Sequence, residues 1–340
     1  MHLVQRLLAA VGGKKIKGDG DEEWSEDGVG SQPSCACVSL QGRRPYMEDV
    51  LVTSLRHGQG SFFGCFDGHG GKRAALWARD HLESALRTQL ASKPAAEALT
   101  SAFLRTNETF LEHAHSEDGL DDGCTALVAL LVDRNLYVAN AGDSRAVLCG
   151  KRSRLAQLST DHTAEEAAER QRIVSAGGVI INSRIEGVLA PSRGFGDRQL
   201  SKWVSACPDV QHLLLMPGDD FLVLATDGVW SVLTNDQACS VVVKEKSALD
   251  AARKLTSEAI RRGSTDNVSA VVVDLRLVTR KIGWMEASVG REPSCCGRSS
   301  DIRSSARGHQ SALIDEDAED SDVEALLRAT SSAYCTYTKY

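Results

Sequence analysis

Two apolar runs lie close together in residues 135–149, NLYVANAGDSRAVLC, where only Ala141-Gly142-Asp143 separates them. Two such runs on either side of a short glycine-containing turn are typical of a β-hairpin. A hairpin joins neighbouring strands that run in opposite directions. The pattern therefore predicts that the fold is built around antiparallel sheet.

Other segments of the chain add strands and helices that come in runs. Short apolar runs predict strands at 61–66, 124–132, 220–225 and 267–276. Helical spacing predicts helices at 72–90, 95–114 and 248–262. Capping boxes at 163–166 and 234–237 predict that a helix begins at each, the first ending before Gly177. Long antiparallel strands with paired helices indicate a layered α+β sandwich.

Composition divides the chain into a folded centre and two low-complexity ends. Of the 340 residues, 42% are hydrophobic, which is enough for the core of one large domain. Residues 1–33 change from basic to acidic, and residues 280–340 are rich in Ser and Arg and then acidic. Such segments bury too little apolar area to fold. We predict a mobile arm over 1–33, a folded domain over 34–279 and a disordered tail over 280–340.

Net charge and cysteine content limit the classes of partner that the chain can bind and the cellular compartment in which we expect it. The net charge of −7 argues against nucleic acid as a partner, and no apolar run is long enough for a membrane span. The ten cysteines include Cys65, Cys124 and Cys149 in apolar stretches, and no zinc spacing is present. We interpret them as small core residues in a reducing compartment. We predict a monomer in the cytoplasm or nucleus; an organellar transit peptide remains open because no acid precedes Asp19.

Three aspartates stand where a predicted strand meets a loop. Asp67 and Asp227 each follow an apolar strand and precede a glycine, whereas Asp266 comes just before one. A single Asp-Gly pair indicates only a turn. Three acids gathered in one cleft would repel each other, so they need cations, and oxygen ligands favour Mg²⁺ or Mn²⁺ over zinc. The glycine at 68 leaves space for a metal and offers its own carbonyl as a ligand.

Seven short motifs carry a resemblance to a known family. In chain order they are RPYMED (44–49), FDGHGG (66–71), GCTA (123–126), NAGDSRAVL (140–148), GVLAPSRGFGD (187–197), ATDGVW (225–230) and TDNVSAVVV (265–273). Their order and strand contexts resemble those of the metal-dependent type 2C protein serine/threonine phosphatases. The resemblance spans about residues 35–276. Together with the element pattern, it implies a four-layer α-β-β-α sandwich, with two central antiparallel sheets flanked by paired helices.

The resemblance implies a two-metal phosphomonoesterase that acts on phosphorylated proteins. Two Mg²⁺ or Mn²⁺ ions would be held by Asp67, the Gly68 carbonyl, Asp227 and Asp266. Glu48 and Asp49 are similar to acids that hold metal-bound waters. The resemblance implies that activated water attacks phosphorus in line, without a covalent intermediate, that His69 protonates the leaving oxygen, and that Arg44 binds the phosphate.

The chain departs from the family pattern after ATDGVW. Many relatives have an aspartate there that, with a residue matching Asp143, helps to hold a third metal, whereas this chain has Ser231. A third metal site at Asp143 is therefore in doubt, and the aspartate could instead serve the hairpin turn. For Arg193 and Asp197 we expect a structural role, an ion pair that pins a loop.

Three functions stay open on the sequence. The first is an active protein serine/threonine phosphatase. The second is a pseudophosphatase that binds phosphoproteins without turnover, supported by Ser231 and opposed by the complete aspartate set. The third is a hydrolase of small phosphate esters. The segment 162–185 resembles the variable flap beside the family's active site, and we expect it to help to select substrates.

Overall fold

The structure is a computed structural model that describes residues 14–17, 22–27, 33–55, 60–117, 120–150 and 154–281. All of these belong to one compact unit, residues 1–291. The predicted disordered tail lies outside the described residues except for its first two positions, 280 and 281, which continue a helical turn that begins at residue 276. The tail therefore stays a prediction.

Two antiparallel sheets form the centre of the unit. The seven-stranded sheet contains, in spatial order, β1 (Lys14–Lys17), β2 (Glu22–Asp27), β3 (Ser34–Leu40), β17 (Val268–Asp274), β16 (Asp219–Ala225), β10 (Arg145–Gly150) and β11 (Leu155–Gln157). The five-stranded sheet contains β15 (Asp209–Leu214), β9 (Asn135–Ala141), β8 (Ala126–Val132), β5 (Ser61–Phe66) and β4 (Val50–Ser54). The two predicted strands are present as β9 and β10, but the predicted hairpin was wrong: β9 pairs with β8 and β15, whereas β10 pairs with β16 and β11 in the other sheet. The turn at residues 142–144 therefore connects the two sheets.

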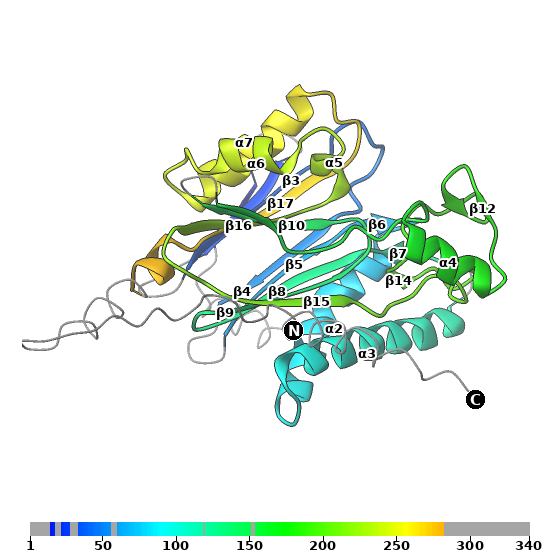
Figure 1. Cartoon of the computed structure of the whole chain (residues 1–340). Coiled ribbons are helices and arrows are strands. Elements are labelled where there is room, and N and C mark those ends of the chain that lie inside the picture. The colour runs from blue at the N-terminus through cyan, green and yellow to red at the C-terminus, as the bar shows by residue number, and fades with distance from the viewer. Residues whose placement is uncertain are drawn as a thin grey trace, which may run out of the picture. The chain divides into compact units, whose positions relative to one another are not determined.

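The two sheets lie face to face, and helices cover their outer faces (Figure 1). The inner core contains Phe63 of the five-stranded sheet and Val271 of the other. The neighbouring residue in each strand faces outward: Phe62 packs against helices on one side and Val272 on the other. Because the central strands are buried on both faces, their sequences are continuously apolar instead of alternating.

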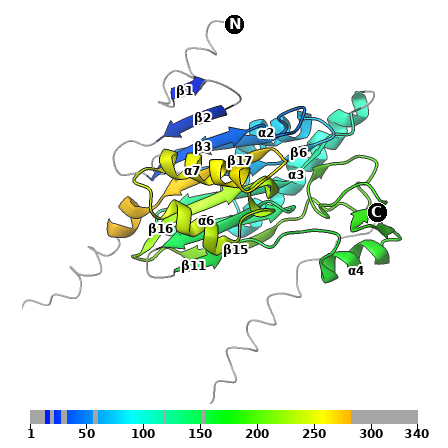
Figure 2. The ribbon, with the colours of Figure 1, turned by 90° about the horizontal axis from the view of Figure 1, so that it is seen from above.

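Four helices form the outer layers. The helices α2 (Arg73–Leu90) and α3 (Ala95–Ser116) pack against the five-stranded sheet. The helices α6 (Asn235–Val242) and α7 (Ala248–Arg261) lie over the seven-stranded sheet, as Figure 2 shows. The prediction of a four-layer α-β-β-α sandwich is therefore confirmed.

A second, smaller group of elements lies beside the sheets. It consists of the three-stranded sheet β14 (Phe195–Gly196), β7 (Gly123–Cys124) and β6 (Gly68–His69), the hairpin β12 (Ile180–Ile181) and β13 (Arg184–Ile185), and the helix α4 (Ala167–Ser175). The one-turn helix α5 (Asp227–Trp230) follows β16. Among these short elements, β6 carries Gly68 and His69, β7 carries Gly123, and α5 begins with Asp227.

The local predictions were accurate where a pattern was strong. The strand at 61–66 and the helix that starts at Thr234 are present, the latter with a complete capping box. The box at Thr163 was wrong: α4 begins at Ala167 with Glu166 as its N-cap. Thr163 instead forms an antiparallel bridge with Pro191, and the Ala164 N–H donates to the Ala190 carbonyl, so this backbone pairs with a distant segment.

Three differences concern longer segments. The strands β3, β4 and β15 were not predicted, and β1 and β2 extend the seven-stranded sheet at one end, inside the segment expected to be a mobile arm. The rest of that arm lies outside the described residues. Cys149 is not a free core thiol, because it forms a disulfide with Cys239 that joins β10 to α6, whereas Cys65 and Cys124 are buried and free. No helix in the described part of the chain is long and apolar enough to cross a membrane.

Candidate active site

The acids that the sequence singled out come together from both sheets. Asp67 follows β5 of the five-stranded sheet, whereas Asp227 follows β16 and Asp266 precedes β17 of the seven-stranded sheet. Each of the other two carboxylates acts electrostatically on Asp67, as does that of Asp49 at the start of β4. The two sheets therefore end at one shared acidic cluster.

Glycines allow this close approach. A Cβ atom at Gly68 would lie 2.6 Å from the carbonyl oxygen of Glu48, and one at Gly228 would lie 1.9 Å from that of Asn267. Gly68 thus packs directly on the backbone of the segment that carries Glu48 and Asp49, and Gly228 on that of the segment that carries Asp266. Glycine after the aspartate is required for packing as well as for turning.

Burial and repulsion dominate the electrostatics of the cluster. Burial, with the charges of Asp49 and Asp227 next in size, holds the pKa of Asp67 well above its usual range. Burial and the charge of Asp266 also raise the pKa of Asp227, although a hydrogen bond with Asp67 opposes this rise. Without cations, burial and mutual repulsion therefore disfavour the charged forms of these carboxyl groups.

Two further acids extend the cluster. Burial raises the pKa of Asp49 to about 7, and burial together with the charge of Asp227 raises that of Asp143 to about 7. Asp49 accepts a hydrogen bond from Thr226 Oγ1 at 3.2 Å through one oxygen, but its buried Oδ1 has no partner among the described residues. An unpaired buried carboxylate oxygen is costly, and a metal-bound water is the kind of donor that it lacks.

Arg44 lies at the rim of the cluster. Its Nη2 atom donates a hydrogen bond to Asp266 Oδ2 at 2.6 Å, and about half of its side chain is exposed. The amide of Asn267 holds this rim segment in place: its oxygen accepts from the Glu48 backbone N–H at 2.9 Å, and its nitrogen donates to the Gln41 carbonyl at 2.8 Å. Arg44 therefore faces the acids and can turn toward an anion.

His69 is held by a partner that the sequence did not reveal. Its Nε2 atom lies 2.8 and 3.0 Å from the two carboxylate oxygens of Asp197. Burial would lower the pKa of His69, but the hydrogen bond and charge of Asp197 raise it above the usual value. The predicted ion pair between Asp197 and Arg193 is absent.

Arg193 does pin a loop, but through other acids. It donates to Glu169 Oε1 at 2.7 and 3.0 Å and to Asp209 Oδ1 at 2.8 Å. Glu169 also accepts from Arg172 at 2.8 Å and from the Ser192 hydroxyl at 2.7 Å. Glu169 therefore fastens α4 to the loop that continues to Asp197.

This network gives a prediction for stability. Burial would raise the pKa of Glu169, but hydrogen bonds from Arg193 and Arg172 lower it to about 2. A depressed folded-state pKa stabilises the fold above the unfolded pKa near 4.3, and this stabilisation is lost as pH falls toward 2. We expect Glu169→Gln to cost about 3 kcal/mol at pH 7, the scale of such a shift and of breaking a buried pair. Urea unfolding at pH 7 and pH 3 measures it.

The matched control is Glu112→Gln, an exposed acid on α3 for which we expect a change within about 0.5 kcal/mol. The difference between wild type and Glu169→Gln should shrink at pH 3. A loss of stability that is equal at both pH values would mean that the charge of Glu169 does not stabilise the fold.

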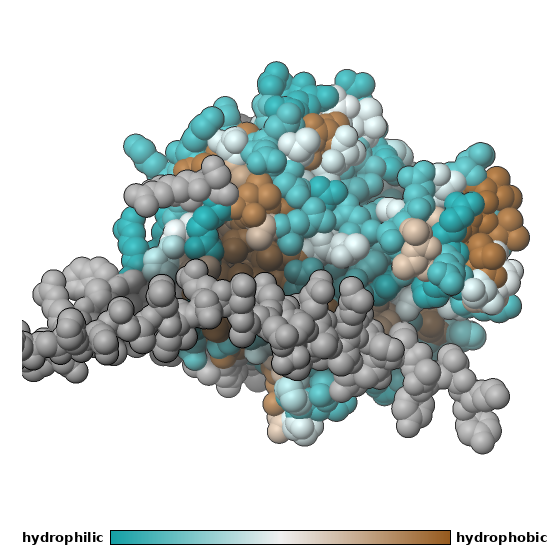
Figure 3. All heavy atoms as spheres, in the orientation of Figure 1, coloured by the Kyte–Doolittle hydropathy of each residue, from teal (hydrophilic) through white to brown (hydrophobic). Residues whose placement is uncertain are grey.

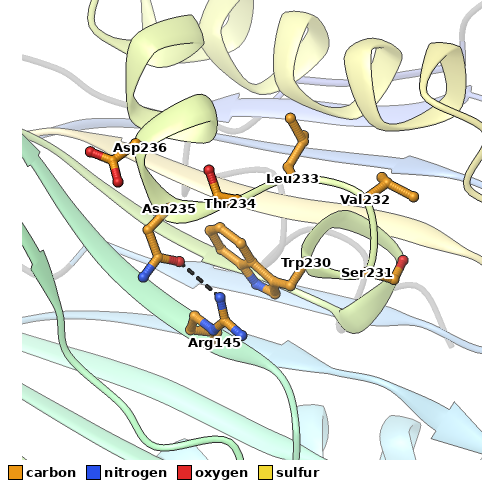
Figure 4. A pocket seen from close by; sticks show the side chains of 8 residues that line it. All are labelled: Arg145, Trp230, Ser231, Val232, Leu233, Thr234, Asn235 and Asp236. Atoms are coloured by element: carbon orange, nitrogen blue, oxygen red, sulfur yellow. Dashed lines mark hydrogen bonds between the residues drawn. The ribbon is translucent and has the colours of Figure 1, made fainter.

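Ser231 lies next to the cluster, directly after α5. It lines a pocket of about 490 Å³ together with Arg145, Trp230 and Asn235, and its hydroxyl points away from Arg145 (Figure 4). Arg145 donates to Asn235 Oδ1 at 2.8 Å and stacks over the Trp230 ring. Position 231, where the resemblance implies a carboxylate, therefore offers only a hydroxyl.

The donors present suit a hard divalent cation. In the described residues, no three acidic, histidine or cysteine side chains form a complete ligand set for one ion. Mg²⁺ usually keeps several waters and takes only one or two protein carboxylates. The carboxyl groups of Asp67 and Asp227, which act electrostatically on each other, and the unpaired oxygen of Asp49 offer oxygen atoms of that kind. The oxygen donors of these residues therefore suit a hard divalent cation that keeps part of its water shell.

The geometry of the site indicates a class of enzyme, and similarity to known proteins shows the family to which the chain belongs. An acidic, oxygen-lined site where two sheets end suits a cation-dependent enzyme that acts on an anionic group. The chain belongs to the protein phosphatase 2C family of metal-dependent protein serine/threonine phosphatases, because the family model "Protein phosphatase 2C" matches residues 34–268. The resemblance predicted from the motifs is thereby confirmed.

Individual relatives agree with this family. The chain is 41% identical to "Probable protein phosphatase 2C 55" of Oryza sativa subsp. japonica, across 73% of this chain and 68% of that protein. It is 42% identical to "Probable protein phosphatase 2C 76" of Arabidopsis thaliana, across 72% of this chain and 59% of that protein. A rice relative that is 42% identical is named "Probable protein phosphatase 2C member 13, mitochondrial"; the match covers 70% of this chain and 67% of that protein.

A solved structure shows the same fold. The "serine-threonine phosphatase 2C from Toxoplasma gondii" superposes with a TM-score of 0.65 at 21% identity and covers 77% of this chain and 99% of that one. At this identity the likeness concerns the fold alone.

Sequence reasoning missed several residues that shape the site. Asn267 and Thr125 lie within the quoted motifs but received no role. Thr125 Oγ1 accepts the Asp67 backbone N–H at 3.1 Å, and the Thr125 N–H donates to the Asp67 carbonyl at 2.9 Å. The only signals in the sequence were the position of Asn267 beside Asp266 and that of Thr125 within GCTA, and neither indicates a partner.

Proposed function

We propose that this chain hydrolyses phosphoserine and phosphothreonine esters of proteins with two divalent cations, Mg²⁺ or Mn²⁺. The observation that carries the proposal is the shared acidic cluster, in which burial and mutual repulsion raise the pKa values of Asp67 and Asp227. Such a cluster is unfavourable by itself and becomes favourable when cations balance it.

We assign the cations to Asp67, the Gly68 carbonyl, Asp227 and Asp266, and metal-bound waters to Glu48 and Asp49. When bound, two such cations lower the pKa of a water molecule and offset the charge of the phosphate group. Hydrolysis then proceeds by in-line attack of water on phosphorus, without a covalent enzyme intermediate.

The chain's own side chains do the remaining work. Arg44 exchanges its bond with Asp266 for the phosphate oxygens, because a guanidinium matches paired oxygens well. His69 donates a proton to the serine or threonine oxygen as it leaves, since an alkoxide is a poor leaving group.

One observation favours a protein over a small phosphate ester as substrate. The segment 174–188 includes the exposed apolar residues Val174, Val179, Ile181 and Val188. In Figure 3, apolar side chains gather at the end of the unit that carries β12 and α4. A small phosphate ester does not need such a surface, whereas a protein substrate can cover it. We assign substrate selection to the flap 162–185 on this ground.

The first experiment compares hydrolysis of a phosphothreonine peptide with and without Mn²⁺. Metal-dependent release of phosphate supports the proposal. Metal-dependent turnover of small esters alone would favour the small-ester hydrolase. Tight binding of the phosphopeptide without turnover would favour the pseudophosphatase.

We further propose that the protein is a monomer in the cytoplasm or nucleus. Analytical sedimentation of the full chain tests the oligomeric state, and localisation of a tagged full chain tests the compartment.

Ser231 gives a second prediction, on the third cation. If that position needs a carboxylate, Ser231→Asp should make activity saturate at a several-fold lower Mg²⁺ concentration, because the new acid would join Asp143 and Asp227. Asp143→Asn should cost less than about threefold in the natural background, since this site is already incomplete. Initial rates against Mg²⁺ concentration for the three proteins measure both effects. A large loss from Asp143→Asn, with no change from Ser231→Asp, would contradict the prediction.

A further inference from the structure

The hydrogen bond between His69 and Asp197 is built by the small three-stranded sheet. In this sheet β7 lies between β6 and β14, so that Gly123 pairs with His69 on one side and with Gly196 on the other. His69 and Asp197 are 128 residues apart in the chain. The sheet therefore brings the imidazole and the carboxylate together over one central residue.

That central residue must be glycine. A Cβ atom at Gly123 would lie 2.2 Å from His69 Nε2 and 2.3 Å from Asp197 Oδ2. The hydrogen bond therefore runs directly across the backbone of β7, and any side chain there would separate the two groups. The first residue of the GCTA motif thus has a role in the pairing of His69 and Asp197.

The backbone of Asp197 is also held in place. It has a left-handed φ of 47°, which is uncommon for a residue with a side chain. Its N–H donates to the Asp122 carbonyl at 3.1 Å, and its carbonyl accepts from the Leu200 N–H at 2.8 Å. Only 6% of the residue is exposed, and His69 is the single side chain recorded as its hydrogen-bond partner in the described residues.

The chemistry of the pair fixes the roles of the two ring nitrogens. A carboxylate only accepts hydrogen bonds, so Nε2 must carry a proton to lie 2.8 Å from it. The other nitrogen, Nδ1, is then the one available to a substrate. Among the residues that the structure describes, no arginine or lysine forms an ion pair with this carboxylate, and Arg193 pairs instead with Glu169 and Asp209.

We propose that Asp197 is the positioning residue of His69: it holds the imidazole with Nε2 protonated and leaves Nδ1 to exchange a proton with the leaving oxygen. This inference rests on the proposed phosphatase function. It adds a residue to which the sequence pattern gave only a loop-pinning role.

The test compares wild type, Asp197→Asn, His69→Gln and the double variant of the full chain at saturating Mn²⁺. We expect Asp197→Asn to lower kcat on a phosphothreonine peptide by about 10- to 10²-fold, the usual cost of losing such a supporting partner, with little change in KM. On p-nitrophenyl phosphate, which needs no proton on its leaving group, the loss should stay below about threefold. The double variant should be no slower than His69→Gln alone, because both changes disable one unit.

Asp121→Asn is the matched control. Asp121 accepts from the Gln199 backbone N–H at 3.0 Å, so it supports the same loop without touching His69. We expect both substrates to be hydrolysed at the wild-type rate. Equal losses from Asp197→Asn on both substrates, or losses that add to those of His69→Gln, would overturn the proposal.

A spectroscopic measurement keeps the inference separate from the proposed function. In ¹⁵N-labelled wild type with metal, the neutral His69 ring should show the Nε2-protonated tautomer, and finding the proton on Nδ1 would overturn the inference even if Asp197→Asn failed to fold. Absence of metal-dependent phosphothreonine hydrolysis in wild type would instead overturn the proposed function. The tautomer would then still decide whether Asp197 positions the ring.

Discussion

Asp67→Asn is expected to abolish metal-dependent phosphatase activity while making the metal-free protein no less stable. A neutral amide cannot balance two dications, so we expect a loss of about 10³-fold or more in kcat/KM, which corresponds to about 4 kcal/mol of transition-state stabilisation. Phosphate release from a phosphothreonine peptide across a Mn²⁺ series measures this loss. Asp227→Asn should behave in the same way.

The expected stability of metal-free Asp67→Asn depends on the direction in which the pKa of Asp67 is shifted. Burial and the neighbouring acids raise the folded-state pKa of Asp67, and a raised carboxyl pKa destabilises the fold as pH rises above the unfolded value near 3.9. In EDTA at pH 7, the Tm of Asp67→Asn should therefore equal or exceed that of wild type, and the difference should shrink toward pH 4. Added Mn²⁺ should raise the Tm of wild type much more than that of the variant.

Asp80→Asn is the control for both the activity measurement and the Tm measurement. Asp80 is an exposed acid on α2 that pairs with the adjacent Arg79. It should leave the rate and the metal-induced rise in Tm unchanged. Wild-type turnover in Asp67→Asn would disprove the assignment of the cations to this cluster.

His69→Gln is expected to lose about 10²- to 10³-fold in kcat on phosphothreonine, the usual range for a general acid. Glutamine keeps a polar group of similar reach but cannot deliver a proton to an alkoxide. On p-nitrophenyl phosphate the loss should be much smaller, since a nitrophenolate leaves without a proton. Steady-state kinetics on both substrates at the same Mn²⁺ concentration give the comparison.

His81→Gln serves as the matched control for this change. His81 lies on α2, where its Nδ1 atom contacts the Trp77 carbonyl at 2.9 Å, and it is exposed. Its replacement should leave both rates unchanged. If His69→Gln lost as much on p-nitrophenyl phosphate as on the peptide, His69 would be a binding or structural residue instead of the acid.

The sequence by itself determined most of the fold. Strands such as 61–66 and the capping box at Thr234 depend on neighbouring residues, and periodicity and capping express exactly such local preferences. The segment 209–214 was missed because β15 is an edge strand with mostly exposed or half-buried residues, so it has no continuous apolar run. The helix start predicted at Thr163 was wrong for the opposite reason: the local signal was present, but Thr163 forms a tertiary bridge with Pro191 instead.

The acids of the site were equally visible in the sequence. Each of Asp67, Asp227 and Asp266 stands at the end of a strong strand pattern, and the seven motifs resembled one family, which the comparisons confirmed. What each of these residues does in catalysis stays a proposal. The strand ends placed the acids in one cleft, but they did not reveal how much burial raises the pKa of each.

Tertiary structure alone decided which distant residues are partners. Asp197 reaches His69 instead of Arg193, and Cys149 reaches Cys239 from 90 residues away. Local sequence cannot encode these pairs, because each depends on the register of one strand against another and on how closely two backbones approach. Gly123 illustrates the reason: only the order of the small sheet places its missing side chain beneath the hydrogen bond that holds the imidazole.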